Sequence, residues 1–152
     1  QQGKYLGNLP RWQVEGEATF AQNAAVYFDD YEKYSEARDS VIGALIYSVK
    51  PDVDWLTEFM SPKDGYTYGG AAWEKYDGWR IYDVGMAITE VLTALGGPSS
   101  TMQLSQLVGE GLSYENAFTK IYGVEWKKGV NMIAQILVKV FTLSPGLILS
   151  GL

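Results

Sequence analysis

Apolar and small side chains recur at helical spacing along most of the chain. They lie three and four positions apart over residues 80–95 and again over 125–143, which is the pattern of helices with one buried face. The segment 12–26 is rich in alanine, the strongest helix former. Alternation of period two, which is typical of strands, is limited to residues 65–69. The pattern therefore predicts a mainly α fold, a single helical domain over residues 1–152 with about six or seven helices.

Breaking and capping residues predict where these helices begin and end. A helix that starts near Ser35 or Arg38, after a solvated connection rich in charge, should end before Pro51, because proline disfavours the α conformation in the preceding residue. Gly-Gly-Pro at 96–98 and Gly123 are expected helix stops. Three further helices should start after side chains that can accept a hydrogen bond from free backbone N–H groups. These residues are Asp52, Ser99 or Ser100, and Ser113.

The segment Ser61 to Gly78 breaks the helical pattern, because it is rich in glycine and aromatic residues. Long connections inside a compact domain are commonly functional, and aromatic side chains favour an ordered conformation. We therefore expect one long, ordered loop. Its rings have two interpretations. Tyr68, Trp73 and the neighbouring Trp79 could stack against the sugar rings of a ligand, or the rings pack the loop onto the helices, which is their commoner role.

Composition narrows the chemistry that the chain can perform. It has 12 basic and 18 acidic residues, a formal net charge of -6, and neither histidine nor cysteine. Disulfides, thiol nucleophiles, cysteine-based metal sites, serine–histidine triads and histidine-ligated metals are therefore excluded from the chain itself. The acidic balance argues against nucleic acid as a partner, because phosphate binding relies on Lys and Arg.

No apolar run is long enough to predict a transmembrane span. A spanning helix needs about 18 or more consecutive apolar residues. The nearest candidate, residues 132–152, is interrupted by Lys139 and Pro145, among others. We expect a buried helix followed by an apolar tail. Within that tail, Leu147-Ile148-Leu149 favours self-association or docking.

Carboxylates are the strong metal ligands that remain. Glu15 and Glu17 lie two residues apart, so they point to different faces of a helix and cannot form a paired site alone. Two acidic clusters, at 29–32 and 52–54, lack the spacing of a calcium loop and favour a solvated surface. A phosphate-binding glycine loop and a G-x-S-x-G motif are both absent. The residues by themselves therefore indicate no complete catalytic site.

The segment 9–18 carries a more specific signal, the sequence L-P-R-W-Q-V-E-G-E-A. It resembles the P-x-W-x-x-E-G-x-A motif of gluzincin-type zinc metallopeptidases, the superfamily of thermolysin-like and aminopeptidase N-like enzymes. In that family the glutamate is the third zinc ligand, on the helix that follows the H-E-x-x-H helix. The resemblance implies that Glu15 is a zinc ligand. It also implies that Gly16 and Ala18 let this helix approach a neighbour closely.

A second motif lies downstream. Tyr82-Asp83-Val84-Gly85 resembles the Y-x-x-G opening of a helix in aminopeptidase-like members. There the tyrosine hydroxyl stabilises the oxyanion formed when zinc-bound water attacks the scissile carbonyl, so the resemblance gives that role to Tyr82. The glycine turns and the Ala-Phe pair at 117–118 that follow are similar to the family's C-terminal helical tail. The similarity covers roughly residues 9–137.

The resemblance also implies that the aromatic segment borders the substrate cleft. The cleft candidates are Tyr66, Tyr68, Trp73 and Trp79. Both motif residues keep a simpler interpretation. Glu15 is also suited to the first turn of a helix, where a carboxylate stabilises the positive end of the helix dipole. Tyr82 on an apolar stripe is equally suited to the core.

The chain departs from this family in one large respect, because it contains no histidine and therefore no H-E-x-x-H. Either it is the C-terminal portion of a longer metallopeptidase domain, whose upstream segment supplies two histidines and the base, or it is a lineage that lost the catalytic half. Zinc and a peptide substrate are then expected only together with the upstream segment, and the chain alone should not hydrolyse peptides. The alternative function is a non-catalytic helical module that binds, or assembles with, a protein or carbohydrate partner.

Overall fold

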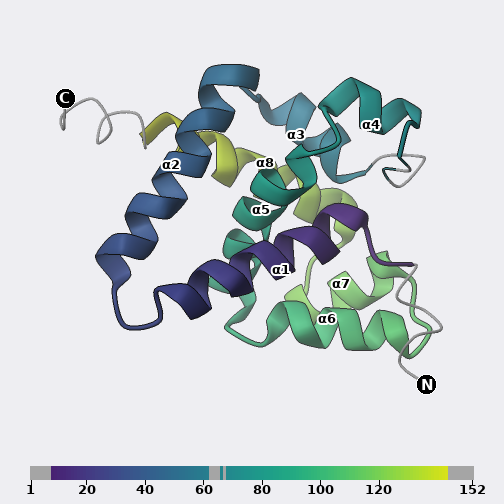
Figure 1. Ribbon diagram of the computed structural model, residues 1–152. Helices are drawn as coiled ribbons and strands as arrows, with labels where there is room; N and C mark the ends of the chain where they lie inside the picture. Colours follow the sequence, from purple (N-terminus) through teal and green to yellow (C-terminus); the bar gives the residue numbers. More distant parts are fainter. Residues whose placement is uncertain (1–7, 62–65, 67, 144–152) are drawn as a thin grey trace.

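The computed structural model describes residues 8–61, 66 and 68–143, apart from the side chains of 45–47. This part of the chain forms eight α-helices and no strand, which confirms the mainly α prediction (Figure 1). None of these helices is long and apolar enough to cross a membrane. The predicted self-association segment 147–149 lies outside the described residues, as do residues 65 and 67 of the stretch 65–69, whose described residues 66, 68 and 69 form turns. The helices are α1 (Arg11–Val26), α2 (Tyr31–Val49), α3 (Val53–Met60), α4 (Ala71–Tyr76), α5 (Arg80–Gly96), α6 (Ser100–Gly109), α7 (Tyr114–Tyr122) and α8 (Trp126–Leu143).

Helices α1 and α5 cross with their backbones in direct contact (Figure 1). A Cβ atom added at Gly16 would lie 2.2 Å from the carbonyl carbon of Gly85, and one added at Gly85 would lie 2.2 Å from the carbonyl oxygen of Trp12. Glycine is required at both positions, because a larger side chain would overlap the backbone of the other helix. The close approach expected for Gly16 is therefore confirmed, whereas Ala18 is exposed.

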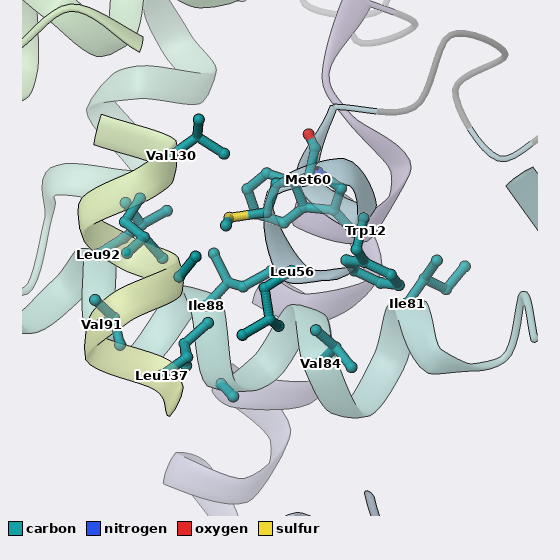
Figure 2. Close-up of a cluster of buried hydrophobic side chains, with 14 of the residues drawn as sticks. Trp12, Leu56, Met60, Ile81, Val84, Ile88, Val91, Leu92, Val130 and Leu137 are labelled. Carbon is teal, nitrogen blue, oxygen red and sulfur yellow. Dashed lines mark hydrogen bonds between the residues drawn. The ribbon is translucent and has the colours of Figure 1, made fainter. Parts of the chain in front are cut away.

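Helix α5 lies at the centre of the fold and contacts α1, α2, α6, α7 and α8. Its sequence is apolar on nearly every side, as is typical of a helix surrounded by others. Figure 2 shows Val84, Ile88 and other α5 side chains among residues of α1, α3 and α8. The fully buried indole of Trp12 donates a hydrogen bond to the carbonyl of Met60 at 3.0 Å. This bond ties α1 to the end of α3.

Helix α2 begins earlier than the charge pattern predicts. The prediction of a solvated connection up to residue 35 is wrong, because the helix starts at Tyr31. The carboxylate of Asp30 accepts a hydrogen bond from the backbone N–H of Lys33 at 3.0 Å and pairs with its ammonium at 2.8 Å. Asp30 thus caps the first turn. The charged residues of that turn lie on an exposed face, where long charged side chains lose little freedom in a helix.

The expected continuous loop over 61–78 contains a helix, so this prediction is wrong for Ala71–Tyr76. The six-residue α4 consists mostly of good helix formers and follows the extended Gly70. It ends at Asp77, whose φ of 53° is left-handed. The helix turns Trp73 and Tyr76 toward the interior. Aromatic residues of this segment are therefore divided between the core and the surface.

The predicted capping residues have different outcomes. Asp52 and Ser113 each accept a hydrogen bond from the backbone N–H three residues on, at 2.8 and 3.3 Å, as predicted. Ser99 precedes α6, but its side chain makes no capping bond to the backbone. Ser100 is the first residue of the helix, and its hydroxyl donates to the carbonyl of Leu92 at 3.2 Å. The hydroxyl of Ser100 therefore joins α6 to α5 instead of capping α6.

Candidate functional site

Glu15 lies in the second turn of α1, next to the glycine at which α1 crosses α5. Its side chain is 27% exposed and pairs with Arg11, whose Nε lies 3.9 Å from a carboxylate oxygen. An ion pair of this length between partly exposed groups is weak. The carboxylate is therefore accessible from solvent and lightly held.

Arg11 connects Glu15 to the aromatic segment. Its guanidinium lies 5.4 Å from the centre of the Trp73 ring and donates a hydrogen bond to the carbonyl of Tyr66 at 3.3 Å. A guanidinium at this distance from an indole makes a favourable cation–π contact. Glu15 thus lies at the edge of the segment that was expected to border a cleft.

Tyr82 lies in the first turn of α5, three residues before the glycine of the crossing. Its side chain is 36% exposed, and its ring stacks against that of Trp79 with the centroids 6.2 Å apart and the planes 21° apart. The neighbouring Asp83 faces the interior, where burial raises its pKa and a 2.8 Å ion pair with Arg80 opposes that rise. Tyr82 therefore lies at the border between core and solvent, with its ring fixed by stacking.

Four rings form a continuous line of contacts, which we name the aromatic row: Tyr68, Trp73, Trp79 and Tyr82. The centroid of Trp73 lies 5.0 Å from that of Tyr68 and 5.6 Å from that of Trp79, and Trp79 in turn contacts Tyr82. Trp73 is only 8% exposed, and a Cβ atom added at Gly78 would lie 2.0 Å from its indole. The Gly78 backbone therefore packs directly against this ring and holds the middle of the row in place.

Tyr66 does not belong to the aromatic row. Its side chain is fully buried, and its hydroxyl donates a hydrogen bond to the carbonyl of Phe59 at 2.9 Å. Its ring packs against Phe59 and Tyr76 in the core. Among the four cleft candidates, Tyr66 and Trp73 are thus buried in the core, whereas Tyr68 and Trp79 are 75% and 64% exposed.

The structure therefore links the side chains of five of the six candidate site residues in one series of contacts. The series runs from Glu15 through Arg11 to the aromatic row and ends at Tyr82. The two motif residues lie on helices that touch at Gly16, directly after Glu15, and at Gly85, three residues after Tyr82. The sequence resemblance proposed both residues but offered no role for Arg11.

The described residues do not fit a complete zinc site. Across 8–61, 66 and 68–143, no group of three or more His, Cys, Asp or Glu side chains could hold a metal ion. The charged group paired with Glu15 is the cation Arg11, which competes with a metal for the carboxylate. This part of the chain therefore supplies fewer than the three protein ligands that a catalytic zinc site needs.

The two acidic clusters have structural roles. Asp30 caps α2, and its hydrogen bonds with Lys33 hold its pKa below the usual value. Asp52 caps α3 through the backbone N–H of Trp55. Both clusters lie at helix starts, where carboxylates stabilise the positive end of the dipole.

Sequence reasoning missed a buried polar cluster where α1 meets α6 and α7. The amide of Gln13, which is fully buried, donates to Glu17 at 2.7 Å and to Ser105 at 3.3 Å. Burial raises the pKa of Glu17, while hydrogen bonds from Gln13 and Ser105 oppose the rise. Burial also raises the pKa of Tyr114 well above its usual value. The available signal was the spacing of four between Gln13 and Glu17, which places both on the face that contains Trp12 and Gly16.

The opposite face of α1 is apolar and exposed. Val14, Ala18, Ala21 and Ala25 follow one another at intervals of four, three and four residues, so they share one side of the helix. All four are exposed, Val14 at 43%. No helix of the described part covers this side, although its composition is typical of a buried helix–helix interface.

Comparison with protein-family models, curated proteins and solved structures gives no match for this chain. The two motifs and the geometry that surrounds them are therefore the features that indicate a function.

Proposed function

We propose that this chain is the C-terminal portion of a gluzincin-type zinc peptidase. Glu15 would supply one metal ligand and Tyr82 the hydroxyl that stabilises the oxyanion, while an upstream segment would supply two histidines and the general base. The observation that supports this proposal is the glycine crossing of α1 and α5. It brings the helix of the E-G motif against the helix of the Y-x-x-G motif, with both motif residues open to solvent.

The proposed role of Tyr82 suits its surroundings. A group that stabilises an oxyanion must hold a hydrogen-bond donor in a fixed position before charge develops. Stacking on Trp79, which itself contacts the buried Trp73, fixes the plane of the Tyr82 ring. The partial exposure of Tyr82 leaves room for a substrate carbonyl beside the ring.

The exposed side of α1 is suited to packing against a further helix, as the proposal requires. Val14, Ala18, Ala21 and Ala25 offer a smooth apolar surface, of the kind that another helix covers. Glu15 follows Val14 directly, so a helix packed there would lie beside its carboxylate. The upstream segment that the proposal requires would therefore have a surface to pack against.

The first test is to read the coding sequence upstream of the Gln1 codon and to express the protein with that segment. We expect an in-frame H-E-x-x-H and one zinc ion per chain, measured by elemental analysis after dialysis. Glu15→Gln should weaken zinc binding by at least about tenfold, because ligand geometry and charge are both altered. Glu17→Gln is the matched control and should retain zinc. An upstream sequence without H-E-x-x-H, or equal zinc content in both variants, would overturn the proposal.

The second candidate function is a non-catalytic binding module. An apolar patch at the turn between α1 and α2 favours it, since Val26, Phe28 and Tyr31 are 62%, 83% and 80% exposed. Acidic residues at 29, 30 and 32 surround this patch, and such an arrangement suits a protein partner with a basic rim. Under this function, Glu15→Gln and Tyr82→Phe would bind a partner normally, whereas Phe28→Ser would not.

A further inference from the structure

The two rings of the aromatic row that flank Trp73 are largely exposed. Tyr68 is 75% and Trp79 is 64% exposed, although both rings contact Trp73, which is nearly buried. Exposed apolar rings that cluster at one place commonly mark a binding surface. This surface adjoins Tyr82, because Trp79 stacks against that ring.

Contacts within the chain hold the middle of the aromatic row in place. Trp73 packs on the Gly78 backbone, lies 5.4 Å from the Arg11 guanidinium and meets Trp79 at an interplanar angle of 69°. A surface that is already ordered loses little conformational entropy when it binds, and aromatic side chains have few rotatable bonds to fix. The exposed rings are therefore suited to binding one flat or bulky apolar group.

The two arginines beside the rings already have partners. Arg11 bonds to the Tyr66 carbonyl and pairs with Glu15, and Arg80 binds Asp83 at 2.8 Å and Ser48 at 3.0 Å. Recognition of a sugar would need polar side chains directed at its hydroxyls. Because both guanidinium groups are bound within the chain, a ligand would contact mainly the faces of the rings. This favours an apolar ligand over a carbohydrate.

We propose that Tyr68 and Trp79 form a subsite for a large apolar or aromatic side chain of a peptide. As a subsite for a substrate, this inference rests on the proposed peptidase function. Binding of such a side chain does not require zinc or upstream histidines. It can therefore be measured on the chain as it stands.

The test is a titration of the chain with two capped tripeptides, acetyl-Gly-Phe-Gly-amide and acetyl-Gly-Ala-Gly-amide, followed by NMR of the tryptophan indole N–H resonances. We expect the phenylalanine peptide to shift the Trp79 resonance and to bind about tenfold more tightly than the alanine peptide. Tyr68→Ala and Trp79→Ala should each weaken this binding about tenfold, as the loss of an aromatic anchor does. Met102→Gln removes a comparably exposed apolar side chain, 69% exposed on α6, and should leave binding unchanged.

Three results would overturn the subsite: equal binding of both peptides, normal binding by Trp79→Ala, or a shift of the Trp79 resonance by chitotriose but not by the phenylalanine peptide. The last result would identify a carbohydrate site. Absence of an upstream H-E-x-x-H would refute the peptidase function without changing the titration. The failure of the subsite and the failure of the peptidase function can thus be told apart.

Discussion

The two sides of helix α1 reverse the usual relation between polarity and burial. The side that faces α5 and α6 buries the polar Gln13 and much of Glu17 along with Trp12. The other side exposes Val14 and a line of alanines. Apolar residues therefore do not by themselves determine which way this helix faces. The glycine at the crossing and the indole of Trp12 determine it, because both need a close partner of one particular shape.

The two sides of α1 thus differ in what determines their packing. The inner side is fixed by steric fit and by hydrogen bonds, which tolerate few substitutions. The outer side is smooth and chemically plain, so it tolerates change until another helix covers it. Substitutions on the two sides of α1 should therefore differ strongly in their effect on stability.

The largest effect is expected when the crossing is filled. Gly85→Ala places a methyl group 2.2 Å from the Trp12 carbonyl oxygen, so the helices must separate. We expect a loss of about 3 kcal/mol or more in the free energy of unfolding, measured by urea denaturation. Gly109→Ala is the matched control, because open space surrounds a Cβ there and α6 should gain about 0.5 kcal/mol. Equal effects at both glycines would contradict the backbone contact.

The next effect concerns the indole that fixes the inner side. Trp12→Phe removes ring volume from the core and leaves the carbonyl of Met60 without its hydrogen bond. We expect a loss of about 2 kcal/mol in the same urea measurement. Trp79→Phe at an exposed position should change stability by less than about 0.5 kcal/mol. A small effect at Trp12 would show that α1 is held elsewhere.

A pH-dependent effect is expected from the buried polar cluster. Burial raises the pKa of Glu17 above 4.5 in the folded chain, so the folded state holds the proton more tightly than the unfolded state. The contribution of this group to stability therefore grows as the pH falls through the raised pKa, and it is complete below 4.5. Glu17→Gln, which resembles the protonated acid, should be more stable than the wild type at neutral pH and should lose this part of the pH dependence.

The prediction for Glu17 is checked by measuring the free energy of unfolding from urea curves at several pH values from about 4 to about 8. Its surroundings consist of Gln13, Ser105, Tyr114 and Tyr122, and none of them carries a positive charge. Glu115→Gln on the exposed side of α7 serves as the comparison for removal of one negative charge. Destabilisation by Glu17→Gln at neutral pH would mean that the ionised carboxylate stabilises the fold.

The smallest effect is expected on the outer side. Ala21→Lys should change the stability of this chain by less than about 0.5 kcal/mol, because the residue is exposed. Ala87→Lys, at a position only 2% exposed, should prevent stable folding. In the protein that includes the upstream segment, Ala21→Lys should lower the thermal midpoint if that segment packs on α1. An unchanged midpoint would leave the outer side without a partner.

Local features of the fold were predictable from sequence, and features that depend on distant contacts were not. Asp52, Ser113 and Gly123 act within a few residues of their own position, and their roles at helix ends are confirmed. The start of α2 at Tyr31 was hidden by a run of charged residues, since charge is equally typical of loops and of exposed helical faces. Helix α4 was hidden by its glycine-rich flanks.

The candidate site shows the same division. The motifs selected Glu15 and Tyr82, and the glycines of the same motifs meet in space. Sequence could not distinguish Tyr66 in the core from Tyr68 on the surface, because residues two apart in an irregular segment have no fixed relation to the core. The part played by Arg11 depends on contacts with residues more than fifty positions away, which no local pattern reports.

Most helix contacts contain a layer of side chains, and that layer gives them compliance, because changes of rotamer let one helix shift slightly on another. At Gly16 and Gly85 no side chain lies between the two helices. Sliding or rolling α1 on α5 would force backbone over backbone. The distance between the two helical turns that carry Glu15 and Tyr82 is therefore fixed when the chain folds. A ligand that needed a different spacing would be opposed by the whole core instead of by a single side chain.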